Sequence, residues 1–361
     1  MKKNWSTATR IILAIAAKDI VDAIKNKTTL TILLSVLFLL IAYRFVPALD
    51  ASDILPRIAV YDTGNSRLVA AMEDDPEFDT IAVTSQEALV SYLGRHDLVV
   101  IGIVLPPGFD AQLAEASSIT LTGYMIHWAN KTQVSKAVEF AETQLTDIVG
   151  KPVHLEVAGN IVYTQKDSRG MALLVALAIT FTLVMIGGSL IPHLILEEKH
   201  ARTLDALLVS PASASHIVIG KALAGLFYAA AAMVAVCITY GYVITHWGVA
   251  ILVLACGGLF AVALGLLIGS VAQNKAQVMI IAWGSMIVLF MALIASVEDI
   301  LPDFVLKVLD WIPTVALSKA VRVSFARTAP VAAFGPELLL VVGWILLLLL
   351  VTTLQMRKSS N

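Results

Sequence analysis

The chain has 361 residues, of which 58% are hydrophobic and only 14% are charged, and its formal net charge is −2. Soluble domains contain about 25% charged residues, so this composition excludes an ordinary soluble protein and indicates several membrane spans. The small net charge and the lack of basic runs interleaved with aromatic residues argue against binding to nucleic acid. Both cysteines, Cys237 and Cys256, lie in apolar stretches, which favours neither a disulfide framework nor a metal site.

Residues 1–27 are predicted to carry an amphipathic helix, from about Arg10 onward, that lies on the membrane surface. Four apolar residues share one stripe of this helix: Leu13, Ala17, Ile20 and Ile24. Three charged residues lie on the other side: Lys18, Asp22 and Lys25. Such a helix lies in the interface with its lysines toward the lipid headgroups. Ile11 and Ile15 break the pattern.

Residues 28–46 are predicted to form the first membrane span, with an apolar core from Thr28 to Tyr43. This core is slightly short, because a span needs about 20 apolar residues. Tyr43 and Arg44 are expected to act as interfacial anchors at its far end. A cleavable signal peptide is the alternative, since Ala48 and Ala51 follow the apolar core, but the amphipathic leader is far longer than an ordinary n-region.

Residues 47–169 have the pattern of a small water-soluble α/β domain, because short apolar runs alternate with helix-like segments. Strands are predicted at residues 57–61, 80–83, 98–105, 119–126 and 153–157. Helices are predicted at residues 66–72, 86–93, 110–116 and 132–149. Acidic residues outnumber basic ones here, whereas the leader is rich in lysine and arginine. The positive-inside rule therefore places the leader in the cytoplasm and this domain outside.

Residues 170–354 are predicted to contain five further spans. Their expected bounds are 171–196, 222–244, 249–271, 278–296 and 338–354. Lys275, in a short link, and the basic residues of the tail 355–361 indicate the cytoplasmic side. Residues 298–330 are too charged and too rich in proline to cross, so their apolar pieces, 304–309 and 314–323, are predicted to be interfacial or re-entrant helices on the outside.

Small residues recur every four positions in one of these spans, at Gly257, Ala261, Gly265 and Gly269. Such a face permits close approach of another helix. Packing within the chain is the preferred interpretation, and a seam between two copies is the alternative.

The polar stretch from Glu197 to Pro211 follows an apolar run and is the main candidate for a functional site. Charged side chains are costly in the bilayer centre, so this stretch is predicted to be an aqueous loop. Three leucines at i, i+3, i+4 spacing share one face of a short helix, which Pro211 ends: Leu204, Leu207 and Leu208. This face is expected to bind another protein; the alternative is a solvated loop whose leucines lie on the chain's own helices.

The string Glu-Glu-Lys-x-x-Arg-Thr-Leu-Asp-Ala-Leu-Leu-Val-Ser-Pro at residues 197–211, followed by Gly220-Lys221, resembles the first cytoplasmic loop of ABC-2 type transporter permeases. Those permeases often have glycine before the threonine, where this chain has Arg202. Residues 99–109, an apolar strand and a Pro-x-Gly-Phe turn, resemble part of the external domain in the long-insert branch of the family. Residues 310–314 with Arg322 resemble its proline-containing segment before the last span.

This resemblance implies an all-α bundle of six transmembrane helices with an inserted α/β extracytoplasmic domain, in the bacterial inner membrane with both termini in the cytoplasm. It implies the permease subunit of an ABC exporter for hydrophobic or amphiphilic cargo, of the drug, lipid or polysaccharide class. Two partners are implied: a separate cytosolic ABC ATPase and a second permease copy, identical or related. The external domain would contact cargo, a periplasmic adaptor or its twin.

Within the implied coupling loop 197–220, the residues expected to contact the ATPase are Glu197, Glu198, Lys199, Arg202, Thr203, Leu204, Leu207, Leu208 and Pro211. The chain has no P-loop of its own, because Gly220-Lys221 is followed by alanine, so ATP is expected on the partner and no cofactor here.

Other chemistries find little support in the sequence. One cluster has metal-ligand residue types but no HExxH order: His193, Glu197, Glu198 and His200. Acids are scarce in the spans, which disfavours a proton-coupled transporter or a membrane-embedded enzyme. The alternative function is a non-transporting sensor or scaffold whose external domain binds a ligand or partner.

Overall fold

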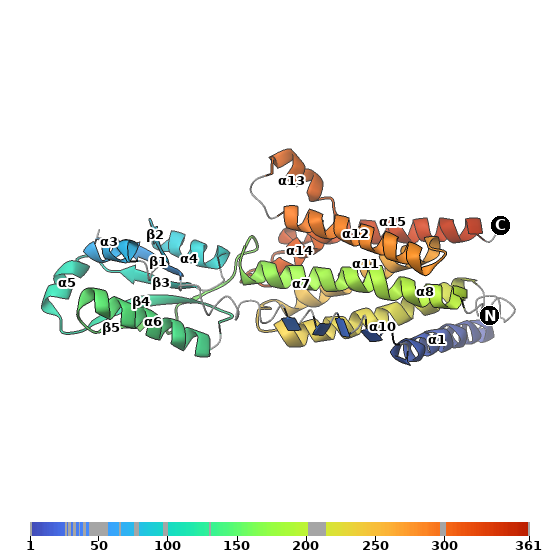
Figure 1. Cartoon of the computed structure of the whole chain (residues 1–361), viewed down its shortest axis with the longest axis horizontal. Helices are drawn as coiled ribbons and strands as arrows, with labels where there is room; N and C mark the ends of the chain where they lie inside the picture. Colours follow the sequence, from blue (N-terminus) through green and yellow to red (C-terminus); the bar gives the residue numbers. More distant parts are fainter. Residues whose placement is uncertain are drawn as a thin grey trace.

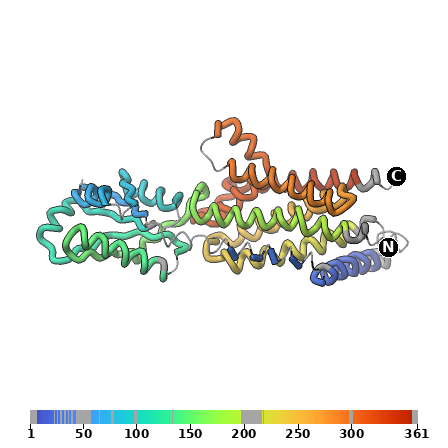
Figure 2. The backbone as a smooth tube through the Cα atoms, in the orientation of Figure 1, coloured from blue at the N-terminus to red at the C-terminus, as the bar shows by residue number. Residues whose placement is uncertain are grey.

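The computed structural model describes residues 2–25, 57–64, 66–75, 79–96, 100–129, 131–200, 214–296 and 301–359, with scattered positions between 27 and 42. The molecule is elongated, with a β-sheet at one end and long helices running along its length at the other (Figures 1 and 2). We call the end of the helices nearest the sheet the sheet end, and the opposite end the loop end.

The sheet has six strands, ordered β2-β1-β3-β4-β5, with β6 also paired to β4. Their bounds are β1 Arg57–Asp62, β2 Asp79–Val83, β3 Val100–Leu105, β4 Ile119–Ile126, β5 Val153–Glu156 and β6 Ile161–Val162. β1 is parallel to β2 and β3, β4 is antiparallel to β3, and β5 and β6 are parallel to β4. The five predicted strands are present; β6 was not predicted, because two residues carry no periodic signal.

Helices cover both faces of this sheet. They are α3 Arg67–Asp74, α4 Gln86–Arg95, α5 Phe109–Glu115 and α6 Lys131–Val149, close to the predicted ranges. Successive residues of β1 point to opposite faces: Ile58 and Val60 pack in one cluster with α3 and α6, and Ala59 packs in another with α4. The second cluster also includes Trp128 and residues of the long helices, so the sheet and the helices share one apolar core at the sheet end.

Five helical stretches in the described residues are long and apolar enough to cross a membrane: Met171–Leu196, Val218–Tyr240, Trp247–Val271, Lys275–Ala295 and Gly335–Gln355. They belong to α7 Met171–Met185 with α8 Ile191–His200, α10 Ala214–Tyr240, α11 Trp247–Val271, α12 Lys275–Ala295 and α15 Gly335–Ser359. These agree with the five predicted spans after residue 170. The predicted first span, residues 28–46, lies mostly outside the described residues, so the total of six remains a prediction.

Two short helices precede the last span, as predicted: α13 Asp303–Leu309 and α14 Pro313–Val323. Pro313 stands in the first turn of α14, where its missing N–H costs nothing. α14 is buried against α7, α11, α12 and α15 at the sheet end, whereas α13 projects from the bundle with Phe304 and Val308 exposed (Figure 1). A 3₁₀ turn, Val331–Ala333, leads into α15.

A π-helical turn, Ile186–Leu190, joins α7 to α8 in the middle of the most buried span. It was not predicted, because Gly187-Gly188 lies in an apolar run without periodicity. At this turn the span packs closely on the small face of α11: a Cβ on Gly187 would lie 2.5 Å from the Ala261 carbonyl oxygen, and one on Gly265 would lie 2.6 Å from Ile191 Cβ. The small face of α11 therefore serves packing within the chain, which confirms the preferred interpretation.

We predict that Gly187→Ala destabilises the protein by about 1–3 kcal/mol, because the added methyl overpacks against backbone atoms that cannot move aside. The measurement is the melting temperature of the purified chain in detergent, which should fall. Gly284→Ala is the matched control: its Cβ would meet no atom within 4 Å, so its melting temperature should not fall. Equal melting temperatures for wild type and Gly187→Ala would contradict the close contact.

Candidate coupling site

The predicted coupling residues begin on a helix that continues beyond the membrane span. The apolar stretch ends at Leu196, and α8 continues to His200, which adds about 6 Å of helix. The backbone of Glu197, Glu198 and Lys199 is therefore helical, although their side chains lie outside the described part. The other predicted residues also fall there, in the segment 201–213: Arg202, Thr203, Leu204, Leu207, Leu208 and Pro211.

The chain returns on α10, which begins at Ala214, eight residues before the predicted start of that span at Ala222. The difference has a physical reason: residues 214–221 carry polar groups but continue the helix without a proline or a cap signal. Gly220 and Lys221 consequently lie on a helix and not in a loop. Residues 201–213 thus run between two helix ends, α8 and α10.

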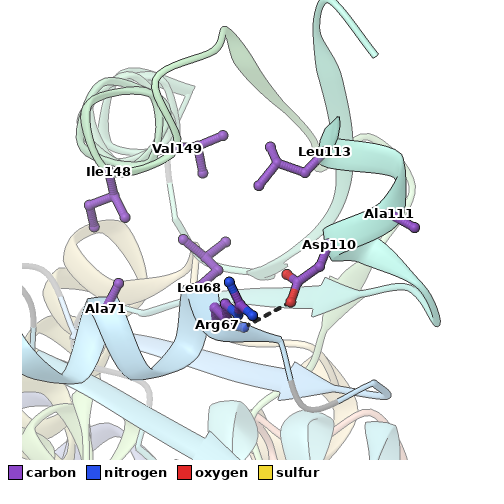
Figure 3. A pocket seen from close by; sticks show the side chains of 8 residues that line it. All are labelled: Arg67, Leu68, Ala71, Asp110, Ala111, Leu113, Ile148 and Val149. Atoms are coloured by element: carbon purple, nitrogen blue, oxygen red, sulfur yellow. Dashed lines mark hydrogen bonds between the residues drawn. The ribbon is translucent and has the colours of Figure 1, made fainter. Parts of the chain in front are cut away.

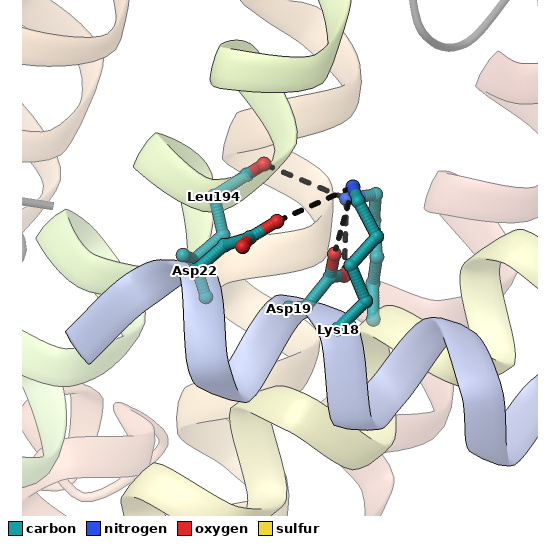
Figure 4. Close-up of polar contacts among 5 residues, drawn as sticks. Lys18, Asp19, Asp22 and Leu194 are labelled. Atoms are coloured by element: carbon teal, nitrogen blue, oxygen red, sulfur yellow. Dashed lines mark hydrogen bonds and ion pairs between the residues drawn. The ribbon is translucent and has the colours of Figure 1, made fainter. Parts of the chain in front are cut away.

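Lys221 of α10 forms an ion pair with Asp19 of the N-terminal helix; Figure 4 shows the polar contacts around Asp19 and Leu194. Lys221 Nζ lies 3.4 Å from Asp19 Oδ2 and 3.5 Å from the Leu194 carbonyl oxygen. Each of the two charged residues is only 5% exposed. A buried charge is costly without a partner, so these contacts hold three elements together: α10 through Lys221, α8 through Leu194 and the N-terminal helix through Asp19.

The N-terminal helix, α1, spans Lys2–Lys25 and packs along α10. Its start is earlier than the predicted Arg10. Ile15 and Ala16 are buried, and a Cβ on Gly220 would lie 2.7 Å from Ile15 Cγ2, so glycine is needed at this contact. The Tyr228 hydroxyl donates to the Ile20 carbonyl oxygen at 2.7 Å.

The face of α1 that packs on the protein is not the predicted apolar stripe. Ile15, which breaks that stripe, is buried, whereas Leu13 is 56% exposed and Ile24 is 54% exposed. The helix therefore has two apolar faces, one against α10 and one open. The open face fits a membrane surface, and its placement there remains a prediction. On the exposed side, Lys18 pairs with Asp22 at 3.6 Å.

Asp19 was not predicted to belong to this site, and Lys221 was predicted only as part of the Gly220-Lys221 motif. The two residues are 202 positions apart in the chain, and nothing in the sequence links them. Each does carry a weak signal: Asp19 is an acid next to a buried helix face, and Lys221 directly precedes a run of apolar residues. In the described residues, no three His, Cys, Asp or Glu side chains are grouped as metal ligands require.

These features define a multi-pass membrane protein whose helices are locked together at the loop end. Residues 27–354 match the family model described as ABC-2 family transporter protein. The chain therefore belongs to the ABC-2 family and is a transport permease of the ABC type. Members of this family are the membrane component and not themselves catalytic, and the family implies a partnering ABC ATPase subunit in general. A comparison with curated protein sequences finds no match.

A double-mutant cycle tests the buried ion pair. Asp19→Asn and Lys221→Met are each expected to cost about 3–5 kcal/mol, because each leaves a buried charge without this partner. The double variant should cost less than the sum of the two, by about 0.5–3 kcal/mol. Melting of the purified chain in detergent measures the three changes.

The control is an exposed pair in the sheet, Arg57 of β1 and Asp79 of β2, whose side chains are 49% and 41% exposed. Arg57→Met and Asp79→Asn should couple by only about 0.2–1 kcal/mol, as exposed pairs do. Additive effects for Asp19 and Lys221 would show that the buried contact does not hold α1 to α10.

Proposed function

We propose that this chain is the permease subunit of an ABC exporter that moves hydrophobic or amphiphilic cargo out of the cytoplasm. In this proposal residues 28–46 form a first span, giving six, and residues 47–169 form an extracytoplasmic domain. Both termini lie in the cytoplasm, and the membrane is the inner membrane of a bacterium. The N-terminal end of α1 and the C-terminal end of α15 both lie at the loop end, which supports a common side for them (Figure 1).

The observation that carries this proposal is the helical connection from the predicted docking segment into the bundle. α7, the π turn and α8 form one continuous helix from Met171 to His200, about 45 Å long. The last turn of this helix lies beyond the apolar stretch. Just before that turn, the Leu194 carbonyl oxygen contacts Lys221 of α10, which also pairs with Asp19 of α1. An ATPase bound to residues 197–211 would therefore act on a helix that reaches the other end of the membrane.

Coupling of this kind requires that the ATPase bind residues 197–211 differently in its two nucleotide states, because only differential affinity shifts a conformational equilibrium. Glu197, Glu198, Lys199 and Arg202 would provide polar contacts. Leu204, Leu207 and Leu208 would fill an apolar groove on the ATPase. Thr203 and Pro211 would set the ends of the short helix that carries these leucines.

Exposed apolar faces on the helices support a location in lipid and contact with a second permease copy. α7–α8 and α11 are largely buried by other helices, whereas α10, α12 and α15 are largely exposed. The exposed residues of α12 include Ile280, Trp283 and Val288, which are large and apolar. Such faces need lipid, cargo or another permease copy to cover them. The proposal assigns two copies, identical or related, to one transporter; a periplasmic adaptor is compatible with it.

Docking is tested by co-purification of the tagged chain with candidate ATPase subunits from its host. Wild type should retain an ATPase, and Glu198→Ala/Leu207→Ala should lose at least nine-tenths of it, since one polar and one apolar contact are removed. Glu87→Ala/Val90→Ala, an exposed pair on α4 far from the loop end, is the matched control and should retain it. Retention by every variant would place docking elsewhere.

Failure of any ATPase to co-purify with wild type would favour the sensor or scaffold. Vesicles that contain the chain with its ATPase provide the test of direction, because accumulation of cargo only in the import direction would refute export.

Orientation is tested by labelling single cysteines in a background of Cys237→Ser/Cys256→Ser. Ser117→Cys lies on an exposed turn before β4, and Gln273→Cys lies on the exposed link between α11 and α12 at the loop end. In spheroplasts, a membrane-impermeant maleimide should label Ser117→Cys fully and Gln273→Cys less than about one-tenth as much, because the bilayer excludes charged reagents. The reverse labelling would invert the proposed topology.

A further inference from the structure

A recess of about 270 Å³ lies where the sheet meets the helices, and two of its four lining residues are arginines. The residues that line it are Arg95, His96, Asp167 and Arg169. Arg95 is the last residue of α4, and Asp167 and Arg169 belong to the segment that leads from β6 into α7. The recess is too small for a drug-sized molecule, which occupies about 300–1,000 Å³, but its size suits a single headgroup.

Hydrogen bonds fix the backbone and one arginine of this recess. Arg169 N–H donates to the Arg95 carbonyl oxygen at 2.7 Å, and Gln165 N–H donates to the Gly94 carbonyl oxygen at 2.9 Å. Arg95 Nε lies 3.2 Å from Asp167 Oδ2 and 3.2 Å from Gln165 Oε1. The end of α4 is therefore joined to the segment before α7, and Arg95 and Arg169 are held near one another.

Two more arginines, from α14 and from the segment that follows it, contact the segment that leads from β6 into α7. Arg322 of α14 donates through a terminal guanidinium nitrogen to the Ser168 carbonyl oxygen at 3.1 Å, and its buried Nε has no hydrogen-bond partner among the described residues. Burial lowers the pKa of Arg322, and the charges of Asp167 and Arg169 act on it with opposite signs. The Arg327 guanidinium lies over the Tyr163 ring, 5.5 Å from its centroid.

The cluster of arginines lies at the ends of two apolar spans, where lipid headgroups are expected. Arg169 precedes the first residue of the α7 span by two positions, and His246, which bonds to the Arg327 carbonyl oxygen, precedes the α11 span by one. Among the described residues, these arginines outnumber the acid that contacts them, Asp167, so the cluster is expected to attract anions. Guanidinium groups bind phosphate with paired hydrogen bonds, and each basic residue near a charged membrane surface adds to the attraction.

We propose that the cluster of Arg95, Arg169, Arg322 and Arg327, the junction cluster, binds a phosphate group at the membrane surface. The phosphate is carried by an amphiphile in the adjacent leaflet or is free in solution; both present the same anionic oxygens. The unpartnered Nε of Arg322 and the recess beside Arg95 and Arg169 are the places for these oxygens. The site goes beyond the proposed export function and does not depend on an ATPase.

A second recess provides the contrast and a matched control (Figure 3). It measures about 520 Å³ and lies between α3, α5 and α6, on the face of the sheet opposite α4. Its acid, Asp110, accepts hydrogen bonds from the Ser66 hydroxyl and from the Arg67 backbone N–H, which lower its pKa. Because the backbone of Arg67 makes this bond, Arg67→Gln removes one positive charge without disturbing it.

The experiment is a lipid titration of the purified full-length chain in a neutral detergent, with phosphatidylglycerol or phosphatidylcholine added. Binding is measured by native mass spectrometry and by the shift in melting temperature. Wild type should bind phosphatidylglycerol at least tenfold more tightly than phosphatidylcholine. Arg95→Gln/Arg169→Gln should lower the affinity for phosphatidylglycerol about 25-fold, about fivefold for each charge. Arg67→Gln should leave it within about twofold.

Asp167→Asn provides a test with the opposite sign, so that a loss of binding through misfolding can be recognised. Removal of this acid should raise the affinity for phosphatidylglycerol about fivefold, and it costs little stability because the Arg95–Asp167 pair is half-exposed. Equal binding of the two lipids by wild type would overturn the proposal, as would equal binding of phosphatidylglycerol by wild type and the double variant.

A titration with inorganic phosphate distinguishes a lipid headgroup from free phosphate as the ligand. A melting shift with phosphate in wild type, absent in Arg95→Gln/Arg169→Gln, would support the site and assign it to free phosphate as well. A shift with phosphatidylglycerol alone would support the site and assign it to a lipid headgroup. A phosphate shift of equal size in wild type and the double variant, without lipid selectivity, would overturn it.

Discussion

The exclusion of charge from the bilayer divides this molecule into two charged ends joined by an apolar middle. A charge near the bilayer centre costs several kcal/mol, so the helices place their ionisable groups at their ends. At the loop end these groups include the buried pair of Lys221 and Asp19, and at the sheet end they include the junction cluster. The helix from Met171 to His200 connects the two ends.

The two charged ends serve different physical purposes. At the loop end the charges are paired and buried, so they fix the relative positions of α1, α8 and α10. At the sheet end the described arginines outnumber Asp167, and two of them line a recess, which is the basis for proposing an anion there. A paired buried charge holds a structure together, whereas an excess of charge at a membrane surface attracts a ligand.

Much of the fold could be predicted because its signals are local. The spans after residue 170 follow from the length of the apolar runs. The strands and helices of the sheet region follow from the spacing of apolar residues and from the polar residues, glycines and prolines that separate the runs. Ser66 and Ser85, for example, cap α3 and α4 where serine before an apolar period predicts a helix start. The small face of α11 indicated close packing because glycine and alanine recur at helical spacing.

Features that depend on contacts between distant residues could not be predicted. The ion pair of Asp19 with Lys221 requires α1 to lie on α10, and the choice between the two apolar faces of α1 depends on Gly220. The junction cluster combines residues from α4, the segment before α7, and α14, whose separation in the sequence hides their proximity. The side chains of the predicted docking residues lie outside the described part, so their role remains a prediction.

The π turn at Ile186–Leu190 determines how a movement at the loop end would reach the sheet end. A π turn has a wider ring of hydrogen bonds than the α-helix around it and is a site where helices bend. Here Gly187, the second residue of the turn, lies against the backbone of Ala261, while α8 extends to the docking segment. Under the proposed coupling, α8 would move relative to this contact, and α7 would carry less of the movement to the junction cluster.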